Sequence, residues 1–513
     1  MIRKIPARFG YIATIFISVT ASVFTTLYIF SIGQILAYGD AESHINIAKR
    51  VIDSLTPRFG QLGGVWLPLQ HLMMVPFVWN DFLWRTGLGG SIVSMICYII
   101  ASICIYQIIY LLTKSPLASV AGALVFIFNP NILYLQATPL GEISLIVMMV
   151  LATYFLLRWG IEDNFLYLIL GAFFIFCGTL IRYDAWFFVI CSLGIIPFVA
   201  LLKKYQYVKI ESTMILYGCV AFLGMIFWLG WNFLIFKNPL YFIASPYSAK
   251  AQQLAWLKQG QLPSYHHIWS AIIFYTVASI KNAGLVTCVL GVGGLTVYFL
   301  VSLTNKQRFI NFLILLLIVS PYVFYIVTLY AGISIIFVPE LVPKNFLSTL
   351  FNVRYGIMVV PPLAIFIGLL WKFIPWVGRA ILVGLLIFQT VLFFRAGTPI
   401  VLQDGINGLS ARRPPPVNDY VAKHYDGGYI MFDDFSRSAN PVSLNIPMYK
   451  IIYVGNHPYW EESLEHPAKY ARWYIIRHDE NDILWAHFQH NNEFYTYFKP
   501  MYHFEKTYVY RRK

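Results

Sequence analysis

Apolar segments long enough to cross a lipid bilayer recur along the chain from near Tyr11 to near Phe394. A transmembrane helix needs roughly 17–25 such residues, and about 11 segments meet this requirement. Hydrophobic residues make up 58% of the 513 positions and charged residues only 12%, which excludes a soluble globular protein of this size. The sequence therefore predicts an all-α polytopic membrane domain.

Lysine and arginine in short loops predict the orientation of the chain, because such loops resist translocation. Arg3, Lys4 and Arg8 precede the first apolar segment. Further basic residues occur in the loops that this start places on the same side, including Lys114, Arg158, Lys203, Lys306 and Lys372. We expect a multi-pass protein of the cytoplasmic membrane, with the N-terminus in the cytoplasm and the C-terminus outside. This topology requires that the short apolar stretch 267–280 lies at the interface and does not span.

The spacing of the apolar runs divides the chain into two domains. Residues 1–397 form the predicted membrane domain, including a large outer loop over 37–88 with amphipathic helices. A stiff linker is expected over 398–416, because three consecutive prolines end it. Residues 417–513 form a predicted small α/β domain outside the membrane. Its expected strands are Tyr429–Phe432, Ile451–Val454 and Trp473–Ile476, and its expected helices are Val417–His424 and Trp460–Tyr470.

Cysteine spacing and net charge narrow the set of partners. All six cysteines lie in or beside apolar segments without zinc-binding spacing, so we interpret them as core residues. The formal charge of +14 suits an anionic membrane surface or a phosphate-bearing ligand. No nucleic-acid-binding module is present. We therefore expect membrane lipid as a partner and no nucleic acid.

Ionisable residues interrupt the apolar pattern at the predicted outer ends of the helices. Insertion of a charge at hydrocarbon depth costs about 2.5–3.5 kcal/mol, so each of these residues is a candidate for a functional or pairing role. They are spread over more than three hundred positions, yet the topology places them all on the outer side: Asp40, Glu42, Glu142, Arg182, Asp184 and Arg354. This distribution indicates a single outward-facing polar pocket.

Asp40, Glu42 and His44 follow the first apolar segment closely. On a helix, Asp40 and His44 lie one turn apart on a shared face, whereas Glu42 points elsewhere. A carboxylate beside an imidazole can act as a general base. Asp is also a favoured helix cap, so a purely structural role stays open. A divalent metal is a further alternative, although one short acidic motif does not fill an octahedral oxygen shell, and no other cofactor is indicated.

Aromatic and basic residues elsewhere complete the candidate site. Trp66 and His71 lie in the first outer loop, where tryptophan either anchors at the interface or packs against a sugar ring. Arginine suits phosphate because its planar fork donates two hydrogen bonds at once. The candidate phosphate-binding residues, the strongest first, are Arg182, Arg354, Arg58 and Lys250. Tyr355 follows Arg354 in the sequence. A structural pairing of Arg182 with Asp184 stays open.

Several short motifs occur in an order similar to that of the GT-C superfamily of membrane glycosyltransferases. Within it the chain resembles the branch of protein O-mannosyltransferases and the lipid A aminoarabinose transferase. The motifs are Asp40, Trp66-Leu67-Pro68-Leu69, Asn129-Pro130, Thr138-Pro139-Leu140-Gly141-Glu142, Leu180-Ile181-Arg182-Tyr183-Asp184 and Asn352-Val353-Arg354-Tyr355. The resemblance implies a GT-C membrane domain in which Asp40 is the catalytic carboxylate. Many relatives have two adjacent acids, whereas here Ala41 separates Asp40 from Glu42, which leaves the role of Glu42 open.

The resemblance also implies a reaction. The donor would be a sugar linked to polyprenyl phosphate, since nucleotide sugars are not ordinarily available outside the cytoplasm. The acceptor would be a hydroxyl of a glycan, lipid or protein, and transfer would invert the anomeric centre with Asp40 as base. A carrier or flippase of a lipid-linked or anionic substrate is the alternative, and a non-catalytic receptor is a third.

Overall fold

The computed structural model describes residues 7–246, 248–258, 260, 262–342 and 349–513. Arg3 and Lys4, on which the predicted orientation partly depends, lie outside the described residues. The chain divides into two compact units. The first unit comprises Met1–Tyr38, Gly64–Gln70 and Ser91–Ala411, and the second comprises Gly39–Gly63, His71–Gly90 and Arg412–Lys513.

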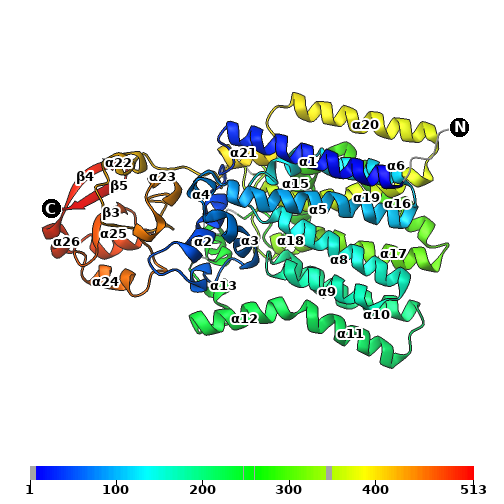
Figure 1. Ribbon diagram of the computed structural model, residues 1–513, viewed down its shortest axis with the longest axis horizontal. Helices are drawn as coiled ribbons and strands as arrows, with labels where there is room; N and C mark the ends of the chain where they lie inside the picture. The colour runs from blue at the N-terminus through cyan, green and yellow to red at the C-terminus, as the bar shows by residue number, and fades with distance from the viewer. Residues whose placement is uncertain (1–6, 247, 259, 261, 343–348) are drawn as a thin grey trace. The chain divides into compact units, whose positions relative to one another are not determined.

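The first unit is a bundle of helices (Figure 1). Its α-helices are α1 (Ala7–Ser31), α5 (Leu88–Thr113), α6 (Pro116–Ile127), α7 (Pro130–Leu135), α8 (Glu142–Glu162), α9 (Phe165–Thr179), α10 (Asp184–Leu202), α11 (Tyr207–Ala221), α12 (Leu223–Phe236), α13 (Tyr241–Ala244), α14 (Ala249–Lys258), α15 (Ile268–Ala283), α16 (Leu285–Ser302), α17 (Lys306–Leu316), α18 (Ser320–Tyr330), α19 (Val360–Phe373), α20 (Trp376–Arg395) and α21 (Ile400–Asn407). The 3₁₀ turns η2 (Leu317–Val319) and η3 (Val353–Val359) precede α18 and α19.

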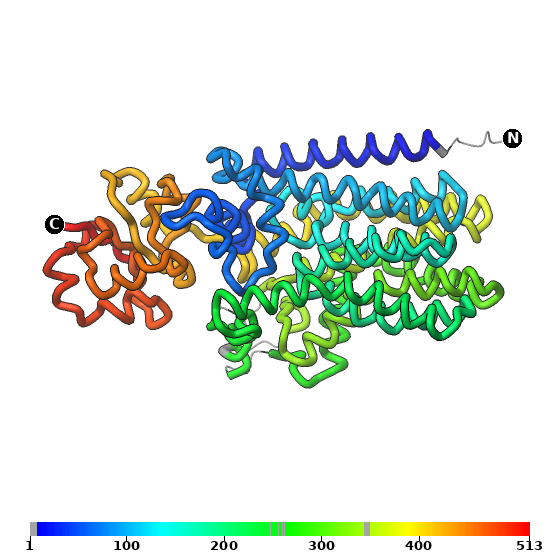
Figure 2. Tube along the Cα trace, turned by 60° about the horizontal axis from the view of Figure 1, so that its bottom comes forward, coloured from blue at the N-terminus to red at the C-terminus, as the bar shows by residue number. Residues whose placement is uncertain are grey.

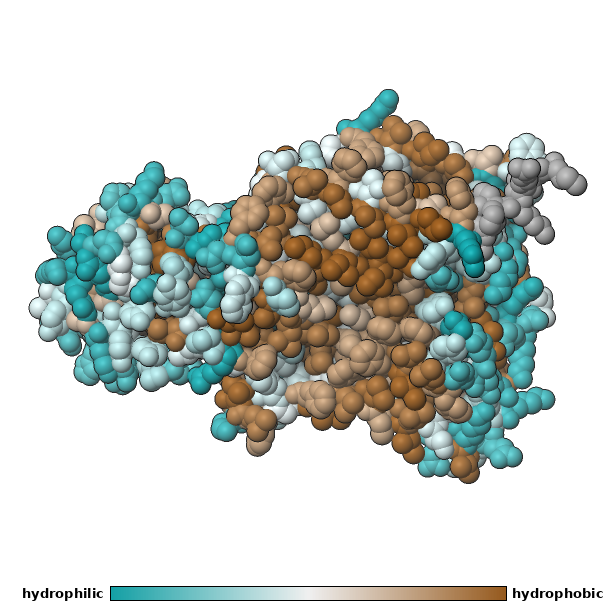
Figure 3. Space-filling view, in the orientation of Figure 1, coloured by the Kyte–Doolittle hydropathy of each residue, from teal (hydrophilic) through white to brown (hydrophobic). Residues whose placement is uncertain are grey.

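Many of these helices are long and apolar enough to cross a membrane. Within the described part of the chain there are 8 such segments, or 9 when α11 and α12, bent by 42° at their junction, count as one span. The sequence predicts about 11 apolar segments. Three further apolar helices, Leu69–Val78, Pro116–Ile127 and Phe165–Thr179, are shorter, with 10–17 residues. Hydrophobic side chains cover the side of the bundle seen in Figure 3. The chain is therefore a multi-pass membrane protein, as predicted.

Burial within the bundle differs sharply from helix to helix. The apolar window of the segment Val353–Phe373 is 89% buried, whereas that of Trp376–Asn407 is 11% buried. Helix α1 runs along an edge of the bundle (Figure 2), and its window is 28% buried.

Gly294 of α16 allows a close approach to α19, since a Cβ there would lie 2.3 Å from Phe366 O. Small residues permit such backbone contacts between membrane helices, where van der Waals packing drives association.

Short polar loops precede several helices at the end of the bundle where α1 begins (Figure 1). Side chains cap these helices: Ser115 accepts from Ala118 N at 3.3 Å, Asn164 from Leu166 N at 2.9 Å and Asn305 from Arg308 N at 3.1 Å. Such caps satisfy backbone donors that the helix leaves unpaired. Lys203 pairs with Asp163 at 2.9 Å, which joins two of these loops.

The second unit is an α/β domain. Its elements are α2 (Gly39–Ile52), η1 (Phe59–Leu62), most of α3 (Leu69–Val78), α4 (Asp81–Thr86), α22 (Val417–His424), β1 (Tyr429–Phe432), α23 (Pro441–Leu444), η4 (Met448–Lys450), β2 (Ile451–Ile452), α24 (Tyr459–Glu465), β3 (Ala471–Arg477), α25 (Ile483–Phe488), α26 (Asn492–Tyr497), β4 (Phe498–Phe504) and β5 (Thr507–Arg512). The strand order is β2-β1-β3-β5-β4, with β1 parallel to β2 and β3 and with β5 antiparallel to β3 and β4. The predicted small α/β domain is thus confirmed.

The structure adds three features that the sequence analysis did not anticipate. Strands β4 and β5 form a hairpin, and both strands contain aromatic and basic residues. Much of the predicted outer loop belongs to the second unit, because side chains such as Leu55 pack against the hydrophobic core beside the sheet. The segment 398–416, expected as a linker, contains α21, whose Val401 and Asp404 are fully buried in the first unit.

Candidate active site

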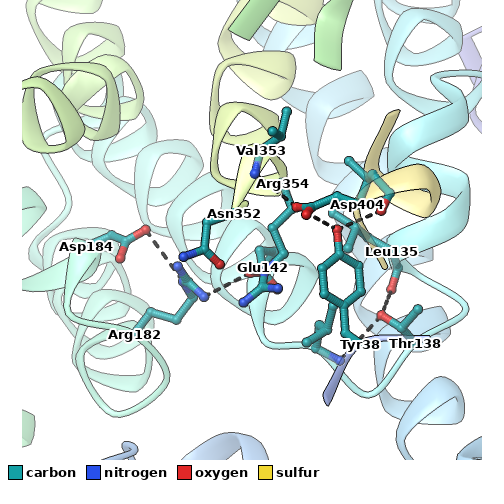
Figure 4. A network of polar contacts seen from close by, with 12 residues as sticks. Tyr38, Leu135, Thr138, Glu142, Arg182, Asp184, Asn352, Val353, Arg354 and Asp404 are labelled. Carbon is teal, nitrogen blue, oxygen red and sulfur yellow. Dashed lines mark hydrogen bonds and ion pairs between the residues drawn. The ribbon is translucent and has the colours of Figure 1, made fainter. Parts of the chain in front are cut away.

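Two arginines share one buried carboxylate in the first unit (Figure 4). Glu142 Oε1 accepts hydrogen bonds from Arg182 Nη1 and from Arg354 Nε, each at 3.0 Å. The Glu142 side chain is 1% exposed and that of Arg354 is 3% exposed, whereas Arg182 retains 19% exposure. Charge-assisted bonds of this kind compensate the cost of burying the three ions.

Asp184 and Tyr325 fix the second edge of the Arg182 guanidinium. Arg182 Nη2 donates to the Tyr325 hydroxyl at 2.9 Å, and that hydroxyl donates to Asp184 Oδ2 at 2.5 Å. Asp184 Oδ2 also lies 3.5 Å from Arg182 Nε. We call Glu142, Arg182, Asp184 and Arg354 the bundle cluster; its two acids balance its two arginines.

A second set of contacts orients Arg354. Its guanidinium lies over the ring of Tyr38, 4.6 Å from the ring centroid. The Tyr38 hydroxyl lies 2.6 Å from Val401 O and 3.2 Å from Asp404 Oδ2. Asp404 Oδ2 also accepts from the backbone N–H of Val353 at 3.1 Å, so α21 holds the turn that carries Arg354.

Local backbone structure explains why these residues occupy element ends. Glu142 is the first residue of α8, where the positive end of the helix dipole favours a carboxylate. Arg182 lies in the turn between α9 and α10, and Asp184 begins α10. Asn352 has a φ of 53°, and this left-handed residue turns the chain into η3 immediately before Arg354.

The Trp66 segment of the first unit packs against the same turn. Leu69 N donates to Leu180 O at 2.9 Å, and the Tyr183 hydroxyl donates to Val65 O at 2.8 Å. The Trp66 side chain is half-buried. These bonds tie the predicted Trp-x-Pro-Leu motif to the turn that carries Arg182.

Tyr355 and Lys250 also belong to the first unit. The Tyr355 ring lies 5.1 Å from the Arg182 guanidinium and 5.3 Å from that of Arg354, so it stands beside both arginines of the bundle cluster. Lys250 is exposed in α14.

The remaining predicted site residues belong to the second unit. Asp40, Glu42 and His44 lie in the first turns of α2, and Asp40 is half-buried. The helix confirms the spacing that places Asp40 and His44 one turn apart. Arg58 is exposed just before η1.

Glu42 is held by an extensive set of contacts within the second unit. Its carboxylate accepts hydrogen bonds from Arg412 Nε, from Asn440 Nδ2 at 3.0 Å and from Val442 N at 3.2 Å. The residue is 3% exposed. These contacts join α2 to Arg412 and to the start of α23.

His44 pairs with a second histidine. Its Nδ1 lies 2.8 Å from Nε2 of His71, which is fully buried in α3. One of the two nitrogens donates the shared proton, and the tautomers decide which. The pair fixes His44 against α3.

The described residues contain no group of three or more His, Cys, Asp or Glu side chains arranged to hold a metal ion.

Sequence reasoning missed three residues that support the bundle cluster. Tyr325 lies inside an apolar helix and reads as a core aromatic, and Tyr38 ends an apolar segment. Asp404 lies in the segment interpreted as a linker. An acid between the apolar residues Leu402 and Ile406 on an amphipathic segment was the available signal for Asp404.

No family model and no curated protein sequence matches the chain. Among solved structures, the chain is similar to the crystal structure of ArnT from Cupriavidus metallidurans bound to undecaprenyl phosphate. The match has a TM-score of 0.55 at 10% sequence identity, and it covers 96% of this chain and 97% of ArnT.

Proposed function

From the GT-C fold that this chain has, we propose that it is a glycosyltransferase whose donor is a sugar linked to polyprenyl phosphate. The observation that carries the proposal is a fold shared along nearly the whole length with a protein solved with undecaprenyl phosphate. The buried bundle cluster supports it, because ionisable groups in a membrane domain are costly and mark functional sites. The N-terminus faces the cytoplasm and the reaction takes place at the outer face.

Arg182 is the proposed contact to the donor phosphate. It is the more exposed of the two arginines, and Glu142, Asp184 and Tyr325 fix the plane of its guanidinium. A guanidinium has five N–H donors, so these contacts leave donors for a phosphate oxygen. Arg354 is deeper and acts as a positioning residue through Glu142. Lys250 and Arg58, both exposed, are weaker candidates for the same anion.

Asp40 is the proposed general base. It accepts the proton of the acceptor hydroxyl while the oxygen attacks the anomeric carbon of the donor sugar. The bond between that carbon and the phosphate oxygen breaks, and polyprenyl phosphate leaves with the electron pair. Attack opposite to the leaving group inverts the anomeric centre. Positioned guanidinium donors stabilise the charge that develops on the phosphate.

Glu42, His44 and His71 support the base in this proposal. Glu42 anchors the first turn of α2 through Arg412, and the His71 contact holds His44 on the face that it shares with Asp40. Trp66 and Tyr355 offer aromatic faces for a sugar ring. The sugar and the acceptor are to be identified by assay.

A transfer assay with purified protein tests this function. The protein in detergent is incubated with polyprenyl phosphates that carry a radiolabelled hexose or amino sugar, together with cell-envelope glycans, lipids and proteins as acceptors. We expect label on one acceptor class and an equal amount of released polyprenyl phosphate. Failure of every donor to transfer would contradict the proposal. In liposomes, movement of the labelled lipid between leaflets without transfer would favour a carrier. Repetition with a chelator and with added divalent ions decides whether a metal takes part.

A further inference from the structure

The sheet of the second unit contains a topological switch point. Strand β1 lies between β2 and β3 and is parallel to both. The chain runs from β1 to β2, which is one neighbour of β1 in the sheet. It then crosses to β3, which is the other neighbour of β1. In open α/β sheets, the loops at the carboxyl ends of two such strands diverge and leave a crevice where ligands bind.

A cavity of about 280 Å³ lies at this position. It is formed by the loop that follows β1 and by the end of β3 with the turn leading into α25. Its lining residues are Phe435, Ser436, Arg437, Arg477, Asp479, Asn481 and Asp482. The volume is close to the lower end of the about 300–1,000 Å³ typical of small-molecule sites.

Two buried acids, Asp433 and Asp482, accept hydrogen bonds that hold the segments lining the cavity. Asp433 accepts from Phe435 N at 2.9 Å in its own loop and from Ile483 N at 3.1 Å across the cavity base. Asp482 accepts from Arg477 N and Trp485 N, each at 3.0 Å. The cavity is therefore preorganised, which lowers the ordering cost of binding.

The acids of the cavity already accept hydrogen bonds from protein groups. The two arginines are therefore the charged groups available to a ligand. Asp479 accepts from the side chain of Asn481 at 2.7 Å and lies 3.7 Å from Lys506 Nζ. Arg477 Nη1 makes a long hydrogen bond of 3.4 Å to Ser436 O. Arg437 is exposed and has a φ of 57°, a left-handed conformation that non-glycine residues rarely adopt and that is enriched at ligand sites.

We propose that this cavity, the β1–β3 cavity, binds a sugar that carries a carboxylate or phosphate group. Arg437 and Arg477 hold the anionic group, because a guanidinium matches the planar carboxylate or the phosphate oxygens with paired donors. Ser436 and Asn481 offer hydrogen-bonding groups to sugar hydroxyls. Phe435 is 51% exposed and presents an aromatic face to the ring. The site does not depend on the proposed transferase activity.

Direct binding to the full-length protein in detergent tests the site. Saturation-transfer NMR is recorded with glucuronic acid and with glucose 6-phosphate, and glucose serves as the uncharged probe. We expect signals from one or both anionic sugars and a dissociation constant at least about tenfold weaker for glucose, since a charge-assisted hydrogen bond contributes about 1.5–3 kcal/mol. The stronger of the two anionic probes identifies the group as carboxylate or phosphate. Equal binding of glucose would overturn the proposal.

Variants assign the signal to the cavity. Arg437→Gln removes an exposed charge and should weaken the anionic probe at least about tenfold without changing the melting temperature. Lys499→Gln removes one exposed positive charge from β4 and should leave binding unchanged. Equal binding by wild type and Arg437→Gln, or equal weakening by both variants, would overturn the assignment.

Discussion

Glu142 and Asp433 are buried carboxylates that are held in different ways. Glu142, in the first unit, accepts hydrogen bonds from two guanidiniums, so loss of its charge would leave the four residues of the bundle cluster with one uncompensated positive charge. Asp433, in the second unit, accepts hydrogen bonds from two backbone N–H groups, and burial raises its pKa to about 6. Guanidinium pairing thus compensates the charge of Glu142, whereas burial of Asp433 favours its protonated form. Asp40, half-buried at the start of α2, differs from both.

The largest effect on stability is expected at Glu142. Glu142→Gln removes the shared acceptor of Arg182 and Arg354, and breaking a buried ion pair costs about 3–5 kcal/mol. We expect a large fall in the midpoint of thermal aggregation in detergent. Glu162→Gln, at the exposed end of the same helix, is the matched control and should shift the midpoint little. Similar midpoints for both variants would contradict the claim that the Glu142 carboxylate is needed to compensate the buried guanidiniums.

The second prediction concerns pH and Asp433. Its pKa is raised in the folded state, so the folded protein binds this proton more tightly than the unfolded chain. The contribution of Asp433 to the free energy of unfolding is fully present below about pH 4 and is lost as the pH rises through about 6. The loss amounts to about 3 kcal/mol, at 1.36 kcal/mol per pKa unit.

Pulse proteolysis of the second unit in urea between pH 4.5 and 7.5 measures this contribution. Asp433→Asn should flatten the pH dependence, whereas Asp419→Asn, at an exposed position of α22, should preserve it. An unchanged slope in Asp433→Asn would show that another group carries the titration.

The smallest of these effects is expected for Tyr325. Tyr325→Phe leaves Arg182 and Asp184 each without one hydrogen-bond partner, which costs about 1–3 kcal/mol. Transfer activity should fall through a higher donor KM, because the Arg182 plane is less fixed, and Tyr330→Phe in the same helix should not change it. A normal donor KM in Tyr325→Phe would argue that Glu142 alone orients Arg182.

The sequence predicted the membrane domain and the α/β domain because apolar length and short alternating runs are local signals. It also selected Glu142, Arg182, Asp184 and Arg354, since charges are conspicuous among apolar residues, and the structure brings these four together. Tyr325 and Tyr38 were missed because a tyrosine in an apolar helix looks like core. The pairing of Glu42 with Arg412 was not visible either, as it joins positions 370 residues apart.

Turnover of Asp40→Asn tests the central claim most directly. Asparagine matches aspartate in size and keeps a hydrogen-bond acceptor in the first turn, so the substitution preserves the start of α2. We predict a folded protein that binds the polyprenyl-phosphate donor normally but transfers sugar at least about 100-fold more slowly, the low end of the contribution of a general base. Asp53→Asn, just beyond the end of the same helix, is the matched control and should keep its rate. Normal turnover of Asp40→Asn with bound donor would show that Asp40 only stabilises the first turn of α2, and would contradict the proposed mechanism.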